Sequence, residues 1–347
     1  MRINDRVIGN NAPCFIIGEA GVNHNGDIEI AKKMIDVAKN AGVDAVKFQT
    51  FKAENVASKY AEMAVYQRRN TGYEEKQLDM IKKFELNYDD FKILKDYCDR
   101  KEIMFLSTPH SPDAIDFLEP LIPIYKIASG DLTNIPFLEK VARKGKPIIL
   151  STGMATLGEI EEAIWTIEKE GNREVLLLHC ISSYPAKIED INLRVIQTLK
   201  EAFKLPVGFS DHTLSTVIPA AAVALGTCVI EKHFTLDKNM NGPDHKTSLE
   251  PDELKEMVGN IREVEKAIGD GIKKPTPEEK KIKKVARRSL VANIDILKGE
   301  IVRGEMISIK RPGYGIEPKY LKTVLGKKVK RDIRKDEVIK WRDLEWA

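Results

Sequence analysis

Titratable and hydroxyl side chains recur at one place in the pattern of this sequence, the ends of short apolar runs. The side chains at or just after these ends are Glu19; Lys47 and Gln49; Ser107, Thr108 and His110; Lys126, Ser129 and Asp131; Ser151; His179, Ser182 and Tyr184; Ser210 and His212; and Glu231 and His233. If the runs are parallel strands, their carboxyl ends meet at one edge of the sheet. Polar groups at all eight ends therefore predict a single catalytic rim.

Two lysines stand in this rim among several serines. Lys47 and Lys126, together with the serine hydroxyls, would form a basic cup rich in hydrogen-bond donors. Such a cup suits a small substrate that carries phosphate and carboxylate groups. A lysine in a barrel can also act as a Schiff-base nucleophile, which is the alternative interpretation.

Two histidines end neighbouring runs of the pattern. Neutral imidazoles at His212 and His233 could bind one divalent metal ion from the same side and leave positions open for substrate and water. His24 and His179 are interpreted as structural. Glu19 and Asp131 are the candidate acid and base groups, and either one could instead be an ion-pair partner of a lysine.

Eight apolar runs of strand length must position these side chains. They cover residues 14–20, 44–50, 103–109, 124–130, 147–153, 175–180, 206–212 and 228–234. Continuous rather than alternating apolar runs are typical of parallel strands covered on both faces. Amphipathic segments lie between them, and two of these close on Gly42 and Gly171, as helices often do. The pattern predicts a (β/α)8 TIM barrel; a doubly wound sheet is the alternative, but no GxGxxG motif supports it.

The amino-acid composition of the sequence changes after Gly271. Residues 272–287 are rich in lysine and proline and predict a linker with a short solvated helix, so the barrel domain is placed at 1–271. Residues 288–347 contain short β-rich pieces and predict a small, mostly β domain. A weak internal repeat, 295–303 against 332–340, lies within it.

Composition and charge exclude several classes of protein. Among 347 residues, 56 Lys and Arg oppose 53 Asp and Glu, so nothing indicates a nucleic-acid partner. The start of the chain has no signal-peptide pattern, and the most apolar stretch, 217–230, is too short for a membrane span. The cysteines are scattered without a CxxC pair, which predicts reduced thiols in a cytoplasmic protein; they are Cys14, Cys98, Cys180 and Cys228.

The motifs along the chain resemble those of the sialic acid synthases, which have a phosphoenolpyruvate-condensing barrel followed by an antifreeze-like (SAF) domain. The resemblance runs through the whole chain. It rests on EAGVNHNG from Glu19, VKFQT from Val46, YKIASGD from Tyr125, LSTGMAT from Leu150, GFSDHT from Gly208, EKHF from Glu231, GPDH from Gly242 and KRPGYG from Lys310.

The resemblance implies a role for each matching residue. Manganese or magnesium would be held by His212 and His233, and Glu19 and Asp131 would serve as acid or base. Phosphoenolpyruvate would be held by Lys47, Lys126, Ser129, Ser151, Ser182 and Ser210. The aminosugar would be held by Glu19, Gln49, Thr108, Tyr184, Asp244 and Arg311. In this family the tail arginine comes from the partner chain of a domain-swapped homodimer.

The implied reaction joins phosphoenolpyruvate, an open-chain N-acetylhexosamine and water, with release of phosphate by C–O cleavage. Three departures from the sialic members bear on the sugar: Asp131 where a glutamate is common, Ser182 where an asparagine is common, and His110 where an aromatic residue is common. N-acetylmannosamine is the predicted sugar, giving N-acetylneuraminate. The alternatives are a 2,4-diacetamido trideoxy sugar, giving legionaminic or, less in keeping with KIASGD, pseudaminic acid. From other classes, the alternatives are a Schiff-base aldolase and a non-catalytic carbohydrate-binding protein.

Overall fold

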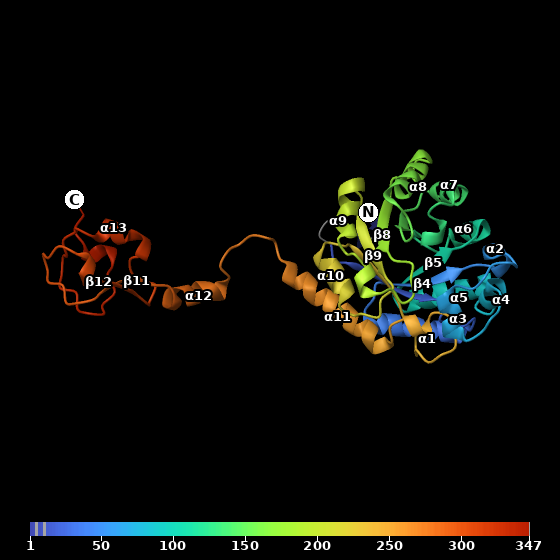
Figure 1. The fold of residues 1–347 in the computed structure, drawn as a ribbon, viewed down its shortest axis with the longest axis horizontal. Helices are drawn as coiled ribbons and strands as arrows, with labels where there is room; N and C mark the ends of the chain where they lie inside the picture. Colours follow the sequence, from blue (N-terminus) through green and yellow to red (C-terminus); the bar gives the residue numbers. More distant parts are fainter. Residues whose placement is uncertain (4–5, 10–11, 347) are drawn as a thin grey trace. The chain divides into compact units, whose positions relative to one another are not determined.

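The computed structural model describes residues 1–3, 6–9 and 12–346, which form two compact units (Figure 1). The first unit covers Met1–Gly269 and the second covers Asp270–Ala347. Each unit is described by itself below. In the described part of the chain, no helix combines the length and the apolar character that crossing a membrane requires.

Eight parallel strands form the centre of the first unit. They are β3 (Phe15–Gly21), β4 (Ala45–Thr50), β5 (Met104–Pro109), β6 (Tyr125–Ile127), β7 (Ile148–Ser151), β8 (Val175–Cys180), β9 (Val207–Asp211) and β10 (Val229–His233). Their order in the sheet is β5-β4-β3-β10-β9-β8-β7-β6. The strands at its two ends, β5 and β6, lie against each other and close the sheet. The predicted TIM barrel is confirmed, and each predicted run overlaps one strand.

Helices surround this sheet (Figure 1). They are α1 (Ile28–Ala41), α2 (Ala53–Val56), α3 (Val65–Thr71), α4 (Gln77–Lys82), α5 (Tyr88–Arg100), α6 (Pro112–Leu118), α7 (Ile135–Ala142), α8 (Leu157–Lys169), α9 (Val195–Phe203), α10 (Ile218–Ala224) and α11 (Pro251–Ile268). Helix α1 shows how the local sequence sets the start, the end and the buried face of a helix. Asp27 accepts hydrogen bonds from the amides of Glu29 and Ile30 at its start, and Gly42 ends it with φ of +83°. Met34 and Ile35 on one side are buried.

The barrel interior has two layers of different character. Alternate residues of a strand point to the same side, so Ile17 and Glu19 share the interior of the barrel, as do Ala45 and Lys47. The lower positions form an apolar cluster with Ile3 of the antiparallel strand pair β1 (Arg2–Ile3) and β2 (Arg6–Val7). The upper positions, two residues further along, are polar on most strands, whereas on β8 this position is Cys180. The alternation of side chains along each strand therefore supplies both the apolar cluster at the lower end of the barrel and the charged layer above it.

The second unit begins with a helix and continues as a small β structure. Its elements are α12 (Pro277–Ala286), β11 (Ser289–Ala292), β12 (Ile307–Lys310) and α13 (Leu321–Val324). Strands β11 and β12 pair antiparallel over an apolar core. The amide of Gly313 donates to the carbonyl of Lys284, so the helix in the predicted linker contacts this unit.

The repeat in the tail corresponds to a reciprocal pairing of its two copies. Ile296 and Ile333 exchange backbone hydrogen bonds of 2.8 Å in both directions. The side chain of Asp332 accepts from the amide of Lys298, and that of Asp295 accepts from the amide of Lys335, both at 2.7 Å. Equivalent residues of the repeat therefore make equivalent contacts.

Candidate active site

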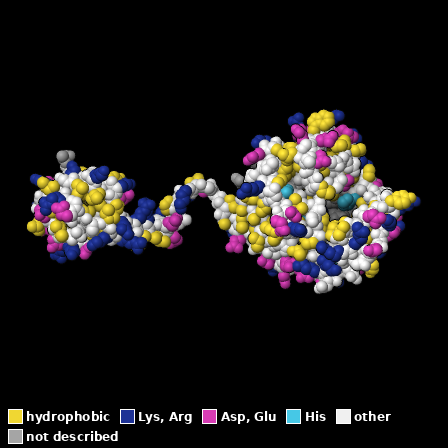
Figure 2. All heavy atoms as spheres, in the orientation of Figure 1, with side chains coloured by type: hydrophobic (Ala, Val, Ile, Leu, Met, Phe, Trp, Pro, Cys, Tyr) yellow, Lys and Arg dark blue, Asp and Glu magenta, His cyan; other side chains and the backbone are white. Residues whose placement is uncertain are grey.

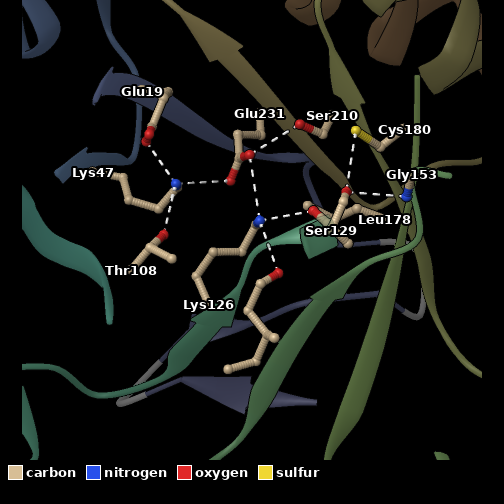
Figure 3. A network of polar contacts seen from close by, with 12 residues as sticks. Glu19, Lys47, Thr108, Lys126, Ser129, Gly153, Leu178, Cys180, Ser210 and Glu231 are labelled. Carbon is tan, nitrogen blue, oxygen red and sulfur yellow. Dashed lines mark hydrogen bonds and ion pairs between the residues drawn. The ribbon is translucent and has the colours of Figure 1, made fainter. Parts of the chain in front are cut away.

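Two lysines and two glutamates alternate in a buried chain of ion pairs at the upper end of the barrel (Figure 3). Lys47 Nζ lies 2.6 Å from Glu19 Oε2 and 3.5 Å from Glu231 Oε2. Lys126 Nζ lies 3.6 Å from Glu231 Oε1. All four side chains are at most 5% exposed. Strands β3, β4, β6 and β10 thus bring two positive and two negative charges into one network.

The network sets the charge states of its members. Burial alone would lower the pKa of Lys47, but the carboxylates of Glu19 and Glu231 outweigh burial and leave that pKa raised. Burial would raise the pKa of Glu231, but Lys126 and Lys47 lower it to about 2. Burial raises the pKa of Glu19 although the charge of Lys47 opposes this shift. Burial also lowers the pKa of Lys126 although the charge of Glu231 opposes it. Glu231 therefore stays ionised and balances both lysines.

Glu231 is the central residue that the sequence analysis did not assign to a role. It bridges both lysines and also accepts a hydrogen bond from Ser210 Oγ at 2.9 Å. The sequence could have indicated this role. Side chains alternate along the EKHF segment, so Glu231 must point to the same side of β10 as His233. The network as a whole supports the anion-binding interpretation, since Lys126 donates to Ser151 Oγ at 2.7 Å instead of standing free as a nucleophile.

A small cluster of donors lies beside Lys126 at the ends of β6, β7 and β8. The amide of Gly153 donates to Ser129 Oγ at 3.0 Å, and Ser129 Oγ lies 3.7 Å from Cys180 Sγ (Figure 3). A methyl group on Gly153 would come within 2.3 Å of Ser182 Oγ and 2.7 Å of Ser129 Oγ. Ser129 and Ser182, both predicted to bind phosphoenolpyruvate, are therefore brought together around a glycine that the prediction did not include.

Replacing Gly153 with alanine should weaken binding of an anionic substrate without unfolding the protein. The added methyl must displace both serine hydroxyls, and we expect KM for phosphoenolpyruvate to rise roughly 100-fold. The measurement is steady-state phosphate release together with the melting temperature. Gly158→Ala is the matched control, because nothing lies within 4 Å of a methyl group there. Equal KM values for the two variants would contradict a binding role for this cluster.

The predicted metal ligands lie side by side. The rings of His212 and His233 have centroids 5.5 Å apart, and Tyr184 stacks on His212 with a centroid distance of 4.1 Å. Nδ1 of His212 is 2.7 Å from the carbonyl of Ile181, a contact that directs Nε2 away from the backbone. Nδ1 of His233 is buried without a hydrogen-bond partner, and burial lowers the pKa of this imidazole.

These two imidazoles fit a divalent ion as a pair of ligands. His212, with one ring nitrogen anchored to a carbonyl and the other directed away from it, has the arrangement common in histidine ligands. Within the described residues, no group of three or more histidine, cysteine, aspartate or glutamate side chains could hold a metal ion. Two protein ligands would leave the remaining coordination positions open for substrate and water.

A cavity of about 250 Å³ opens beside the histidines. Its polar lining includes Gln49, His110, Tyr184, His233 and Asp244. Its other wall is apolar and comes from the segment after β3 and the extra helices between β4 and β5, namely Val22, Phe51, Val56, Met80, Ile81 and Phe84. Figure 2 shows a hollow in the barrel unit with histidine at its edge. The cavity is therefore lined by both polar groups and apolar side chains.

Tyr66 is a second residue of this site that the sequence analysis missed. It lies in α3, lines the cavity and stacks on Tyr184 with a centroid distance of 5.1 Å. Nothing in its sequence context marks it, because α3 follows no strand directly. Only the folding of the segment between β4 and β5 over the mouth of the barrel brings Tyr66 to the site.

Asp244 should make the stability of the fold depend on pH. Burial raises its pKa from about 4 to about 6, so the folded protein prefers the protonated carboxyl. The folded state then binds more protons than the unfolded state between these values, and stability falls as pH rises from about 4 to about 6. Asp244→Asn removes this loss, and we expect the variant to be more stable than the wild type by about 3 kcal/mol at pH 7 and by little at pH 4.

Urea unfolding of both proteins at the two pH values measures this difference. Asp237→Asn, which removes an exposed carboxylate from the same loop, controls for the loss of one negative charge. A stability difference that does not change with pH would rule out Asp244 as the titrating group.

The other predicted residues lie in several environments. Thr108 Oγ1 accepts a hydrogen bond from Lys47 Nζ at 3.1 Å, so Thr108 belongs to the ion-pair network. Gln49 Nε2 donates to Glu19 Oε1 at 3.1 Å. Asp131 accepts from Asn134 and is half-buried, and burial raises its pKa. Arg311 belongs to the second unit, is exposed, and donates from Nε to the carbonyl of Ala286.

The two structural histidines and the cysteines have separate surroundings. His179 Nε2 lies 2.7 Å from the carbonyl of Ile191, and His24 Nδ1 accepts from the amide of Gly26. The four cysteines are free thiols. On the visible face of both units, basic and acidic side chains are interspersed (Figure 2).

Fold and site together define a class: a (β/α)8 enzyme barrel whose mouth combines buried lysines, hydroxyl groups and a histidine pair. Comparison with known proteins gives the family. Residues 34–273 match the model of the NeuB family, and residues 287–345 match that of the SAF domain. The chain belongs to the NeuB family and is a synthase of the sialic acid type, which confirms the family and fold that the motifs predicted.

Similar proteins extend over nearly the whole chain. An uncharacterized protein of Methanocaldococcus jannaschii is 51% identical over 99% of this chain and 98% of its own length. The N,N'-diacetyllegionaminic acid synthase of Campylobacter jejuni is 51% identical over 94% of this chain and 98% of its own. The crystal structure of a sialic acid synthetase from Leptospira borgpetersenii is 37% identical, with a TM-score of 0.71, over 81% of this chain and 94% of that one.

Proposed function

We propose that this protein condenses phosphoenolpyruvate with an open-chain acetamido sugar and water, and releases phosphate. The observation that carries the proposal is the buried chain from Glu19 through Lys47 and Glu231 to Lys126, beside hydroxyl groups and next to a cavity. Phosphoenolpyruvate bears both a carboxylate and a phosphate, and two ammonium groups with several hydroxyls suit both anions. The relatives named as synthases support the same reaction.

Each group of the site has a task in this reaction. Lys47, Lys126 and the serines would bind and orient phosphoenolpyruvate so that its carbon 3 attacks the aldehyde carbon of the sugar. Water adds to carbon 2, and the bond from carbon 2 to the phosphate oxygen then breaks. When bound at His212 and His233, manganese or magnesium would supply Lewis-acid polarisation of the aldehyde oxygen.

Glu19 is the better candidate than Asp131 for moving the proton of the attacking water. Its carboxylate is buried within the network, contacts Lys47 and Gln49, and has a raised pKa. Asp131 accepts its hydrogen bond from Asn134, and its side chain is only half-buried. A carboxylate held inside the site by Lys47 and Gln49 is positioned to accept the proton of the attacking water.

For the sugar, we propose a 2,4-diacetamido-2,4,6-trideoxy hexose, which would give a legionaminic-type acid. The wall of Phe51, Met80 and Phe84 suits the methyl groups of such a sugar. Hydroxyl groups on carbons 4 and 6 would lose hydrogen bonds against this wall. The 51% identical relative named for N,N'-diacetyllegionaminic acid also supports this sugar. N-acetylmannosamine, the sugar predicted from the sequence, is the second candidate, supported by the 37% identical sialic acid synthetase.

The experiment measures phosphate release from phosphoenolpyruvate with manganese and each sugar, with a chelator control. Faster release with the diacetamido trideoxy sugar supports the legionaminic product. Faster release with N-acetylmannosamine supports N-acetylneuraminate as the product and leaves the mechanism unchanged. Release with neither sugar would overturn the proposed reaction.

The tail would complete the site in a domain-swapped homodimer, in which Arg311 of one chain reaches the barrel of its partner. The exposed guanidinium of Arg311, held only through Nε at the carbonyl of Ala286, supports this proposal because its remaining donors are available. Sedimentation of the full chain would reveal the dimer, and Arg311→Ala would raise KM for the sugar without changing the dimer.

A further inference from the structure

A second buried ion pair lies on the other face of strands β9 and β10, away from the barrel interior. Lys232 and Asp211 alternate with the inward-facing Glu231 and Ser210, and the two are partners in the ladder between the strands. Lys232 Nζ lies 2.6 Å from Asp211 Oδ2, and the side chains are 1% and 0% exposed. Both residues belong to motifs noted in the sequence, EKHF and GFSDHT, yet neither reaches the substrate cavity.

Lys232 also holds the backbone of the turn that follows His212. Its Nζ donates to the carbonyl of Thr213 at 2.5 Å and to that of Ser215 at 3.2 Å. With Asp211, these acceptors account for the three donors of the ammonium group. Asp211 in turn accepts from the amide of Thr213 at 2.9 Å and from its hydroxyl at 3.1 Å. The ion pair therefore fixes the turn against β10 through both side chains and backbone.

The two candidate metal ligands sit one residue beyond this pair. His212 follows Asp211 and His233 follows Lys232, so the contact between the two strands directly precedes both imidazoles. A buried ion pair adds little net stability compared with apolar residues of the same size, because removing two charges from water costs about as much as their attraction returns. The contribution of the Lys232–Asp211 pair here is to hold the turn after His212 in place against β10.

We propose that Lys232 and Asp211 are positioning residues that set the separation and orientation of His212 and His233 for a divalent ion. This inference rests on the proposed function, in which the two histidines bind that ion. Residues outside the ligand shell that orient histidine ligands typically change metal affinity 10- to 100-fold when replaced.

The test uses the full-length wild type, Asp211→Asn and Lys232→Met, with binding of Mn²⁺ measured from the electron paramagnetic resonance signal of the free ion. We expect Kd for Mn²⁺ to rise about 10- to 100-fold in both variants. Saturating Mn²⁺ should restore most of kcat, and KM for phosphoenolpyruvate should stay within about twofold of the wild type. Lys238→Met is the matched control, because Lys238 pairs with Glu253 at 2.5 Å in the loop after β10 without holding the turn.

Each possible outcome supports or overturns the positioning role of Lys232 and Asp211. Lower melting temperatures with an unchanged Kd for Mn²⁺ would mean that the pair is merely structural and would overturn the inference. If a single variant does not fold because one buried charge is left alone, the double variant Asp211→Asn with Lys232→Met removes both charges, and its Kd decides in the same way. If the wild type binds no Mn²⁺, the metal part of the proposed function fails and this inference fails with it.

Discussion

Replacing His233 with alanine is expected to lower kcat at least about 1,000-fold and to remove the dependence of the remaining turnover on manganese. A metal ion that polarises a reacting oxygen contributes several kcal/mol to a transition state, and each 1.4 kcal/mol corresponds to about tenfold in rate. His233 lines the cavity next to His212, and its Nδ1 is buried without a hydrogen-bond partner. Phosphate release across a manganese titration measures both effects.

His179→Asn is the matched control for this variant. His179 is also a buried histidine of a barrel strand, but its Nε2 contacts the carbonyl of Ile191 and it lines no part of the cavity. We expect the control to keep its response to manganese even where its melting temperature falls. Unchanged activity and unchanged manganese dependence in His233→Ala would exclude His233 as a ligand.

Replacing Glu231 with glutamine is expected to destabilise the folded protein by about 3–5 kcal/mol, because removing one partner leaves buried charges without compensation. Glu231 is the only carboxylate in the network that pairs with both Lys47 and Lys126. An anion that binds the lysines should recover part of the loss, since a ligand of the folded state stabilises it by mass action. Urea unfolding with and without inorganic phosphate or phosphoenolpyruvate measures both changes.

Glu253→Gln provides the comparison for this second variant. The Lys238–Glu253 pair is short but its side chains are 27% and 36% exposed, so its removal should change stability by less than about 1 kcal/mol. Phosphate should give this control no more stability than it gives the wild type. A loss in Glu231→Gln as small as that of the control would contradict the bridging role of Glu231.

The apolar lining of the cavity and the charged groups of the site come from different segments of the chain. The lysine network and the histidine pair come from the barrel strands, whereas Phe51, Met80 and Phe84 come from the segment inserted between β4 and β5. Changes in that segment can alter the fit of a sugar without disturbing the groups proposed to bind phosphoenolpyruvate. This division is typical of barrel enzymes, in which loops adjust specificity on a constant frame.

The sequence by itself determined the barrel architecture of this protein and the end of the barrel at which its polar residues gather. Continuous apolar runs separated by amphipathic segments predicted all eight strands, since both faces of a parallel sheet are covered. Polar side chains at the carboxyl ends of these runs also placed Lys47, Lys126 and His233 in one rim. A weak repeat in the tail was visible in the sequence, and the structure gives its equivalent residues Asp295 and Asp332 equivalent contacts.

Only the tertiary structure decided which of these groups meet. Closing the barrel pairs β10 with β3 and β9, and this brings Glu231 between two lysines that lie far from it in the chain. The approach of Gly153 to two serines, the stacking of Tyr66 and the contact of Lys232 with Asp211 arise in the same way. A local pattern encodes the face on which a side chain lies. The partner on that face depends on strand order and register, which are set by packing between segments distant in the sequence.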